Sequence, residues 1–146
     1  MGKVEDNLHF NPTPLYRERV NPVLMDTLMD GILQIIVTKK KYKDKYYTAR
    51  KLASDLGTNT RYVSAVLNAR FHMNYTSFVN KYRVEDAMFV LVDKRYQELN
   101  IDEISDMVGF SNRQSFYSAF QKQVGITPKR YRVLHSNQQW LQKKKS

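Results

Sequence analysis

The chain has 146 residues, a formal net charge of +10 at pH 7 and no cysteine. This length is typical of one domain with its own hydrophobic core, and the lack of cysteine excludes disulfides and thiolate zinc sites. The excess of lysine and arginine favours a polyanionic partner, either nucleic acid or an anionic membrane surface.

Several classes of protein are disfavoured by what the sequence lacks. His9, His72 and His135 have no metal-ligand spacing, so we expect no metal and no other cofactor. No nucleophile paired with a base and no phosphate-binding loop occurs, which argues against an enzyme and against a small-molecule pocket. Apolar runs are too short to span a bilayer and no signal peptide is recognisable, so we expect a cytoplasmic, nucleoid-associated protein without a membrane partner.

The N-terminal third begins with a polar stretch. Residues 1–20 carry two prolines and no sustained period, and we interpret them as a flexible arm. Asn21 is a predicted N-cap with Pro22 at the first helical position, and apolar residues at helical spacing as far as Ile36 predict a core helix. Residues 39–47 then hold five lysines against Asp44. This loop is either simply solvated or it contacts phosphates.

A first helix-turn-helix unit follows the lysine-rich loop. Thr48 caps its first predicted helix, Gly57 makes the turn, and Asn59 caps the second helix. This second helix buries either Tyr62 or Val63 on its inner face. Its outward face contains no acid, and the candidate base-reading residues on it are Thr60, Arg61, Ser64, Ala65 and Asn68.

A long helix is predicted next. Thr76 is expected to open it, and an apolar helical pattern continues to about Lys94. At about 1.5 Å per residue such a helix spans about 28 Å, while successive major-groove faces lie about 34 Å apart. One monomer is therefore expected to reach two adjacent major-groove segments.

A second helix-turn-helix unit begins at Asn100, which forms a capping box with Glu103. Gly109 ends that helix because a glycine supplies the positive φ of an abrupt helix exit. Ser111 with Gln114 predicts a second capping box for the next helix.

That next helix again has a polar outward face without acids. Gly125 closes it, and Thr127 followed by Pro128 starts a third helix. The candidate base-reading residues on the outward face are Asn112, Arg113, Gln114, Tyr117, Ser118 and Gln121.

The two units repeat one another, since Thr48, Gly57 and Asn59 recur as Asn100, Gly109 and Ser111. In the second copy the pattern I-x-x-x-V-G-F-S-x-x-x-S-F-x-x-x-F-x-x-x-x-G-I-T-P-x-x-Y-R, over residues 104–132, resembles the DNA-binding domain of AraC/XylS-type regulators. The phrase YRVEDA, over residues 82–87, is similar to the connector helix of that family. Asn74 stands where many relatives have a glycine, and asparagine also tolerates the left-handed conformation.

The resemblance implies an all-α fold of about seven helices, with two tandem helix-turn-helix subdomains on a long connector helix. It places the domain at residues 21–135, divided into a first unit (21–75), the connector (76–95) and a second unit (96–135), with a basic tail at 136–146. It also implies a bacterial transcription regulator that binds specific double-stranded promoter or operator DNA, with RNA polymerase as a candidate second partner. The sequence holds no recognisable effector domain, so we expect a regulator without one.

Phosphate contacts are expected to position the domain while the two polar faces read bases. The candidate phosphate-contacting residues are Lys51, Arg70, Lys81, Lys129 and Arg130. Of Arg130 and the nearby Arg132, one has an equally good structural interpretation, because an arginine next to Tyr131 can hold an acidic group or a helix end. The alternative function is a helical protein-interaction module that docks an acidic partner.

Overall fold

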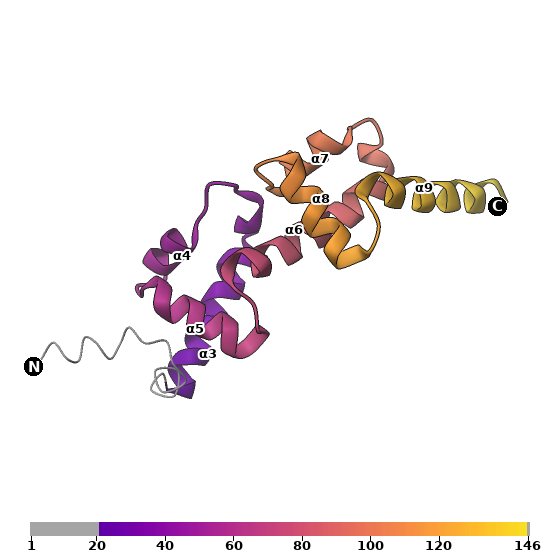
Figure 1. Ribbon diagram of the computed structural model, residues 1–146. Helices are drawn as coiled ribbons and strands as arrows, with labels where there is room; N and C mark the ends of the chain where they lie inside the picture. Colours follow the sequence, from indigo (N-terminus) through magenta and orange to yellow (C-terminus); the bar gives the residue numbers. More distant parts are fainter. Residues whose placement is uncertain (1–20, 146) are drawn as a thin grey trace, which may run out of the picture. The chain divides into compact units, whose positions relative to one another are not determined.

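The computed structural model describes the backbone of residues 21–145 and the side chains as far as Ser136. Over these residues the chain is all-α, with seven α-helices and no strand, which confirms the predicted fold class (Figure 1). The helices are α3 (Pro22–Ile32), α4 (Ala49–Asp55), α5 (Thr60–Phe71), α6 (Tyr75–Val92), α7 (Ile101–Val108), α8 (Arg113–Val124) and α9 (Pro128–Lys145). The arm predicted at 1–20 lies outside the described residues. None of the described helices is long and apolar enough to cross a membrane.

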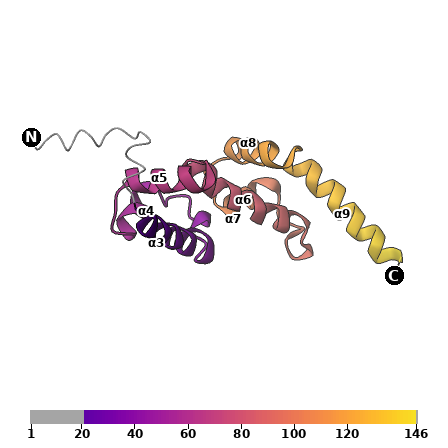
Figure 2. The same cartoon turned by 90° about the horizontal axis from the view of Figure 1, so that it is seen from below.

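The first compact unit contains α3, α4, α5 and the beginning of α6. Helix α5 packs against both α3 and α4, and these three helices lie together in Figure 2. Their contact faces bury Ile32, Leu52, Val63 and Val66 completely. Of the two residues that the sequence offered for the inner face of α5, Val63 and not Tyr62 is therefore the buried one. Helix α3 continues directly into a π-helical stretch, Leu33–Thr38.

The second compact unit contains the rest of α6 with α7, α8 and α9. Its core brings together one face of α6, the inner face of α7 and the two phenylalanines of α8. Phe110, in the turn between α7 and α8, is also buried and its ring lies 5.1 Å from that of Phe116. These contacts fix the angle between the two helices of the second helix-turn-helix unit.

A short segment from the loop between α3 and α4 also belongs to the second unit. We call Tyr42–Tyr46 the strap. The Tyr42 ring is buried, its hydroxyl donates to Asp86 of α6 over 2.9 Å, and Arg83 Nε donates to its carbonyl oxygen over 2.6 Å. Burial, followed by the hydrogen bond to Asp86, raises the pKa of Tyr42 above the ordinary value for a phenol.

The lysines of the strap pair with acids of the second unit. Lys43 Nζ lies 3.7 Å from Asp86 Oδ2, and Lys45 forms an ion pair with Asp106 of α7. Of the lysines in the loop 39–47, these two thus have protein partners and do not simply face solvent. The strap also packs tightly against Gly109, where an added Cβ would overlap the carbonyl oxygen of Tyr42 and lie 2.9 Å from Cα of Lys43.

Most of the predicted helix starts are confirmed. The side chains of Asn21, Thr48 and Asn59 accept hydrogen bonds from backbone N–H groups three residues on, over 2.9, 3.1 and 3.0 Å. Asn100 and Glu103 form the full capping box. Gly109 and Gly125 end their helices in the left-handed conformation, with φ values of 112° and 95°.

Two predicted caps are wrong by one or two residues. Asn112, and not Ser111, caps α8 by accepting from the backbone N–H of Ser115 over 2.8 Å. Asn74, and not Thr76, caps α6 by accepting from Ser77 over 2.8 Å. The left-handed residue before α6 is therefore His72, with a φ of 57°, and Asn74 itself does not take the place of a glycine.

The boundaries of the last elements differ from expectation as well. Helix α6 ends at Val92, a 3-10 turn follows at Lys94–Tyr96, and α9 continues to Lys145, through most of the residues expected to form a basic tail.

The guanidinium of Arg132 on α9 donates to three carbonyl oxygens, one in the last turn of α6 and two in the segment that follows α6. The acceptors are those of Leu91 (3.1 Å), Tyr96 (2.9 Å) and Leu99 (2.6 Å). Burial lowers the pKa of Arg132 below its ordinary value. Arg132 is thus the structural arginine of the pair, while Arg130 is exposed.

Candidate nucleic-acid interface

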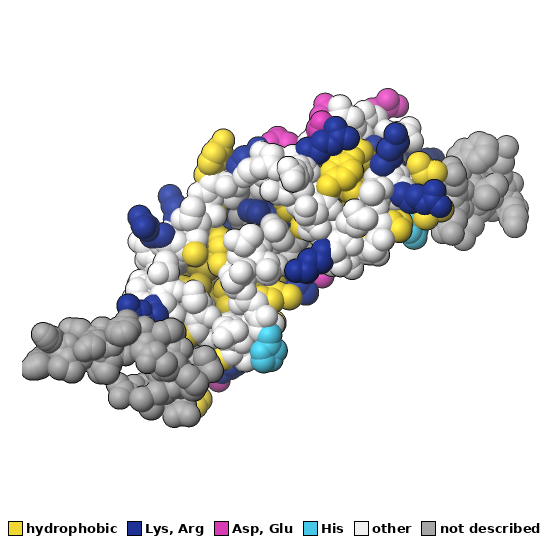
Figure 3. Space-filling view, in the orientation of Figure 1, with side chains coloured by type: hydrophobic (Ala, Val, Ile, Leu, Met, Phe, Trp, Pro, Cys, Tyr) yellow, Lys and Arg dark blue, Asp and Glu magenta, His cyan; other side chains and the backbone are white. Residues whose placement is uncertain are grey.

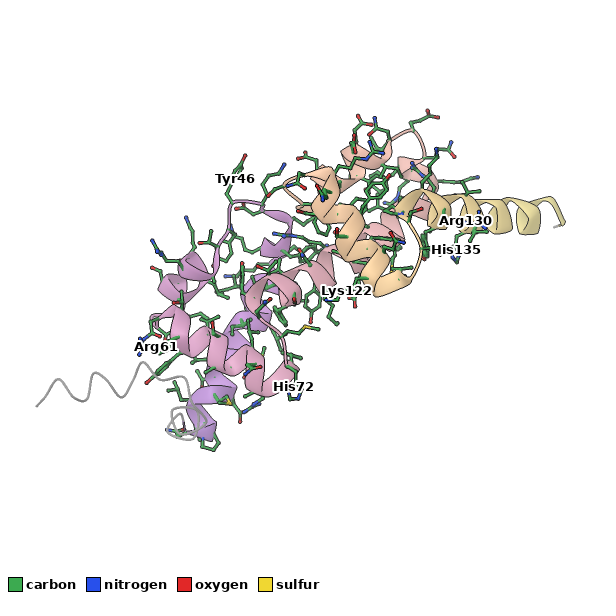
Figure 4. The ribbon with its side chains drawn as sticks, in the orientation of Figure 1. Tyr46, Arg61, His72, Lys122, Arg130 and His135 are labelled. Atoms are coloured by element: carbon green, nitrogen blue, oxygen red, sulfur yellow. The ribbon has the colours of Figure 1, made fainter. Side chains whose placement is uncertain are left out.

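Helix α5 presents most of its predicted reading residues to solvent. Thr60, Arg61, Ser64 and Asn68 are exposed and recur at spacings that place them along one side of the helix. In Figure 4, Arg61 extends outward from the N-terminal end of α5. Ala65 does not belong to this face, because its side chain is only 8% exposed. We therefore leave Ala65 out of the proposed base-reading residues.

Helix α8 presents a comparable face in the second unit. Arg113, Gln114, Ser118 and Gln121 are exposed, and Tyr117 is half-buried with its ring against that of Phe116 at 6.0 Å. Asn112 precedes the helix, and its side-chain oxygen is engaged as the cap. Only its amide group remains to donate to a base, so it contributes as the cap of α8 first and as a reading residue second.

The N-terminal turns of these two helices carry positive charge and no acid, as do those of α4 and α9. Helix N-termini favour acids because the helix dipole and the unsatisfied N–H groups make them positive. Helix α7 follows this rule, with Asp102 and Glu103 in its first turn. Helices α5 and α8 have no acid in their first turns and carry Arg61 and Arg113 there instead. Each N-terminus is therefore a concentrated site of positive potential, suited to a polyanion.

Arg113 is held by two neighbouring side chains. Its Nη2 donates to the Tyr117 hydroxyl over 3.3 Å, and its guanidinium lies 5.0 Å from the centre of the Tyr117 ring. Its Nε lies 3.6 Å from Oδ1 of Asp102 on α7. The hydrogen bond to Tyr117, and then the charge of Asp102, raise the pKa of Arg113 above its ordinary value. The contact of Asp102 with Arg113 has no signal in the sequence, because it depends on the packing of α7 against α8.

The predicted phosphate-contacting residues fall into two groups. Lys51, Lys129 and Arg130 are exposed on the first turns of α4 and α9, and Figure 4 labels Arg130 on α9. Arg70 and Lys81 have protein partners instead. Arg70 Nη2 lies 2.6 Å from Oδ1 of Asp26, and Lys81 Nζ lies 3.1 Å from Oε2 of Glu85. A phosphate would have to displace these carboxylates.

Basic side chains are visible at the surface of each unit in Figure 3. The acidic side chains visible in the second unit gather mainly around α7. In the part of the chain whose side chains are described, no group of histidine, aspartate and glutamate is arranged to hold a metal ion. The chemistry of the outward faces of α5 and α8 is therefore that of hydrogen-bond donors and acceptors with an excess of positive charge.

Curated proteins with similar sequences are transcription regulators. The transcriptional activator AggR of Escherichia coli is 28% identical over 101 residues, which cover 69% of this chain and 37% of AggR. The HTH-type transcriptional regulator AlkR of Acinetobacter baylyi is 26% identical over 91 residues, which cover 62% of this chain and 29% of AlkR. The match thus spans about a third of each of these relatives.

Solved structures with a similar fold include the C-terminal domain of the two-component response regulator yesN from Fusobacterium nucleatum. It has a TM-score of 0.59 and 26% identity, covering 73% of this chain and 95% of that domain. A protein of unknown function from Listeria innocua has a TM-score of 0.65 and 25% identity, covering 73% of this chain and 96% of the other.

A family profile described as "Helix-turn-helix domain" matches residues 52–133. This match extends from the first helix of the first unit to the third helix of the second, and so includes both candidate reading helices. The chain therefore belongs to the AraC/XylS-type helix-turn-helix family of DNA-binding transcription regulators.

Proposed function

We propose that this protein binds specific double-stranded DNA sequences, with α5 and α8 as its two base-reading helices. The observation that carries this proposal is the exposed arginine at the acid-free N-terminus of each helix, followed by an exposed polar face. A positive charge in that place opposes the helix dipole. A DNA duplex supplies the negative charge and the hydrogen-bond acceptors that such a face would bind.

The reading residues of α5 are then Thr60, Arg61, Ser64 and Asn68. Those of α8 are Arg113, Gln114, Tyr117, Ser118 and Gln121, with Asn112 at the cap. Each arginine has the donors to pair bidentately with O6 and N7 of a guanine, which is a specific contact in the major groove. Lys51, Lys129 and Arg130 are proposed to contact phosphates and to set the register of the domain.

Two reading helices on one chain give one monomer two contact regions on a duplex. We expect each to enter its own major-groove segment, so that the bound sequence has two separated blocks of conserved bases. The domain boundaries expected from the sequence (21–75, 76–95 and 96–135) are part of this proposal.

The test begins with selection of bound duplexes from a random pool and measurement of the Kd for the selected and a random duplex at one salt concentration. Arg61→Ala and Arg113→Ala are each expected to cost about 1–3 kcal/mol on the selected duplex and to relax one base preference. Arg50→Ala on α4 removes the same charge from an exposed residue outside the reading helices and serves as the matched control.

The control is expected to leave the ratio of the two Kd values unchanged, because loss of a phosphate contact weakens all duplexes alike. Equal losses on selected and random DNA for Arg61→Ala and Arg113→Ala would contradict the assigned roles. A wild-type protein without any sequence preference would favour the protein-interaction module instead.

A further inference from the structure

The surroundings of Arg113 on α8 show a feature that base reading by this residue does not by itself require. Its guanidinium is contacted on two sides by protein groups in the second unit. The Nε side faces Asp102 at 3.6 Å, and one Nη2 hydrogen is donated to the Tyr117 hydroxyl at 3.3 Å. The two side chains are 63% and 59% exposed, so the pair lies at the surface, where an ion pair adds little to stability.

The donors that remain available form one edge of the guanidinium. An arginine has five N–H donors in a rigid planar fork. With Nε directed at Asp102 and one Nη2 hydrogen at Tyr117, both Nη1 hydrogens and the second Nη2 hydrogen are left. This terminal edge is one that can donate two parallel hydrogen bonds to O6 and N7 of a guanine.

Tyr117 provides a firm support for this arrangement. It lies one helical turn after Arg113, its ring packs edge-on against the fully buried Phe116, and the guanidinium lies over its face at 5.0 Å. Asp102 is placed independently, by the first turn of α7, where the neighbouring capping box of Asn100 and Glu103 fixes the backbone. The two supports therefore come from different helices and constrain two directions of the same side chain.

We propose that Asp102 is a specificity-determining positioning residue, which together with Tyr117 aims the terminal edge of Arg113 at a guanine. This inference rests on the proposed function and deepens it. On a cognate duplex the pair with Asp102 persists and lowers the conformational freedom that Arg113 loses on binding. On a random duplex Asp102 competes with phosphates for Arg113 and repels them, so that non-specific binding is weakened.

A purely structural role for Asp102 makes a different prediction. An acid in the first turn of α7 stabilises that helix through its dipole, so its removal would change the melting temperature and leave DNA discrimination intact. A role through net charge alone would strengthen binding to every duplex equally. The ratio of the Kd values for random and selected DNA separates these possibilities.

The experiment measures that ratio for the full chain carrying Asp102→Asn, with Glu98→Gln as the charge-matched control. Glu98 is also exposed, and it lies in the segment before α7. Asp102→Asn is expected to lower the ratio about fivefold, which is the lower end of the roughly 5- to 150-fold that a bidentate contact supplies. It is also expected to relax the same base position as Arg113→Ala. Glu98→Gln is expected to leave the ratio unchanged.

Two further variants identify the route of the effect. Asp102→Glu retains the carboxylate and is expected to restore part of the ratio. In the Arg113→Ala background Asp102→Asn is expected to change the ratio no further, because the residue that it positions is absent. Thermal unfolding of each variant shows whether the fold is retained.

The inference is overturned if Asp102→Asn behaves like Glu98→Gln, or if its effect persists without Arg113. Failure of the proposed function is distinguishable from this, because it would appear as a wild-type protein with no preference or as an Arg113→Ala variant with an unchanged ratio. Wild-type preference that depends on Arg113 but not on Asp102 would overturn the further inference alone.

Discussion

Replacement of Arg132 by methionine tests the assignment of structural and surface roles to the two arginines at the start of α9. Arg132 donates to the carbonyl oxygens of Leu91, Tyr96 and Leu99, whereas Arg130 is exposed. Methionine keeps a long apolar stem but leaves the three carbonyl groups without these donors. Arg132→Met is therefore expected to loosen the connection between α6 and α7.

The magnitude follows from the three hydrogen bonds. Each hydrogen bond from a charged donor contributes a net stabilisation of about 1.5–3 kcal/mol, but the losses are not additive and water replaces part of them at a half-buried site. We expect a net loss of about 3 kcal/mol in the free energy of unfolding, which corresponds to a fall in Tm of about 10 °C or more. Lysine is a point charge without a planar fork, so Arg132→Lys is expected to recover only part of this loss.

The assay is urea unfolding followed by circular dichroism, with Arg130→Met as the matched control. The control removes the same charge and adds the same side chain two residues earlier in the chain. It is expected to change the free energy of unfolding by less than about 0.5 kcal/mol. DNA binding should show the opposite order, since Arg130 is the proposed phosphate contact. Similar destabilisation by both variants, or an Arg132→Met protein as stable as wild type, would refute the reasoning.

Three further predictions concern the second unit. Gly109→Ala is expected to destabilise the fold more than Gly125→Ala, because both residues have positive φ but only at Gly109 would the new Cβ overlap the strap; equal losses in thermal melts would exclude this contact. The raised pKa of Tyr42 means that the folded state favours the neutral phenol. The contribution of this group to the free energy of unfolding is therefore complete below about pH 10 and is lost as the pH rises above that value. Between about pH 9 and about pH 11, Tyr42→Phe should consequently lose less stability than wild type does, as followed by Tm against pH. Asn100→Ala removes the cap of α7 and is expected to lower the free energy of unfolding, measured in urea, by about 1 kcal/mol. An unchanged midpoint of the urea transition would mean that another group accepts from the backbone N–H groups at the start of α7.

Features that depend on neighbours in the sequence were predictable. The caps at Asn21, Thr48, Asn59 and Asn100 were found because a capping side chain binds a backbone N–H only three residues away. Where two possible caps stood side by side, sequence reasoning chose wrongly. Asn112 prevails over Ser111 in a turn whose preceding residue, Phe110, is buried in the core of the second unit.

Features that depend on packing were not predictable from local patterns. Ala65 is small enough to suit either a reading face or a helix contact, and only the packing of α5 shows that it is buried. The contact of Asp102 with Arg113 and the triple contact of Arg132 join residues on different helices. No periodicity or motif indicates such a pair, because its geometry depends on how the helices meet.

The strap gives the second unit a discontinuous sequence, and this bears on how such proteins are recombined. A hybrid that joined the first half of a relative to the second half of this chain, with the crossover near the beginning of α6, would carry a foreign strap against Asp86, Gly109 and Asp106. Such a hybrid would retain every helix and still lack matched contacts at the turn that leads into α8. Exchange of one specificity for another between relatives therefore requires two pieces of chain to be transplanted together, or substitutions confined to the outward faces of the reading helices.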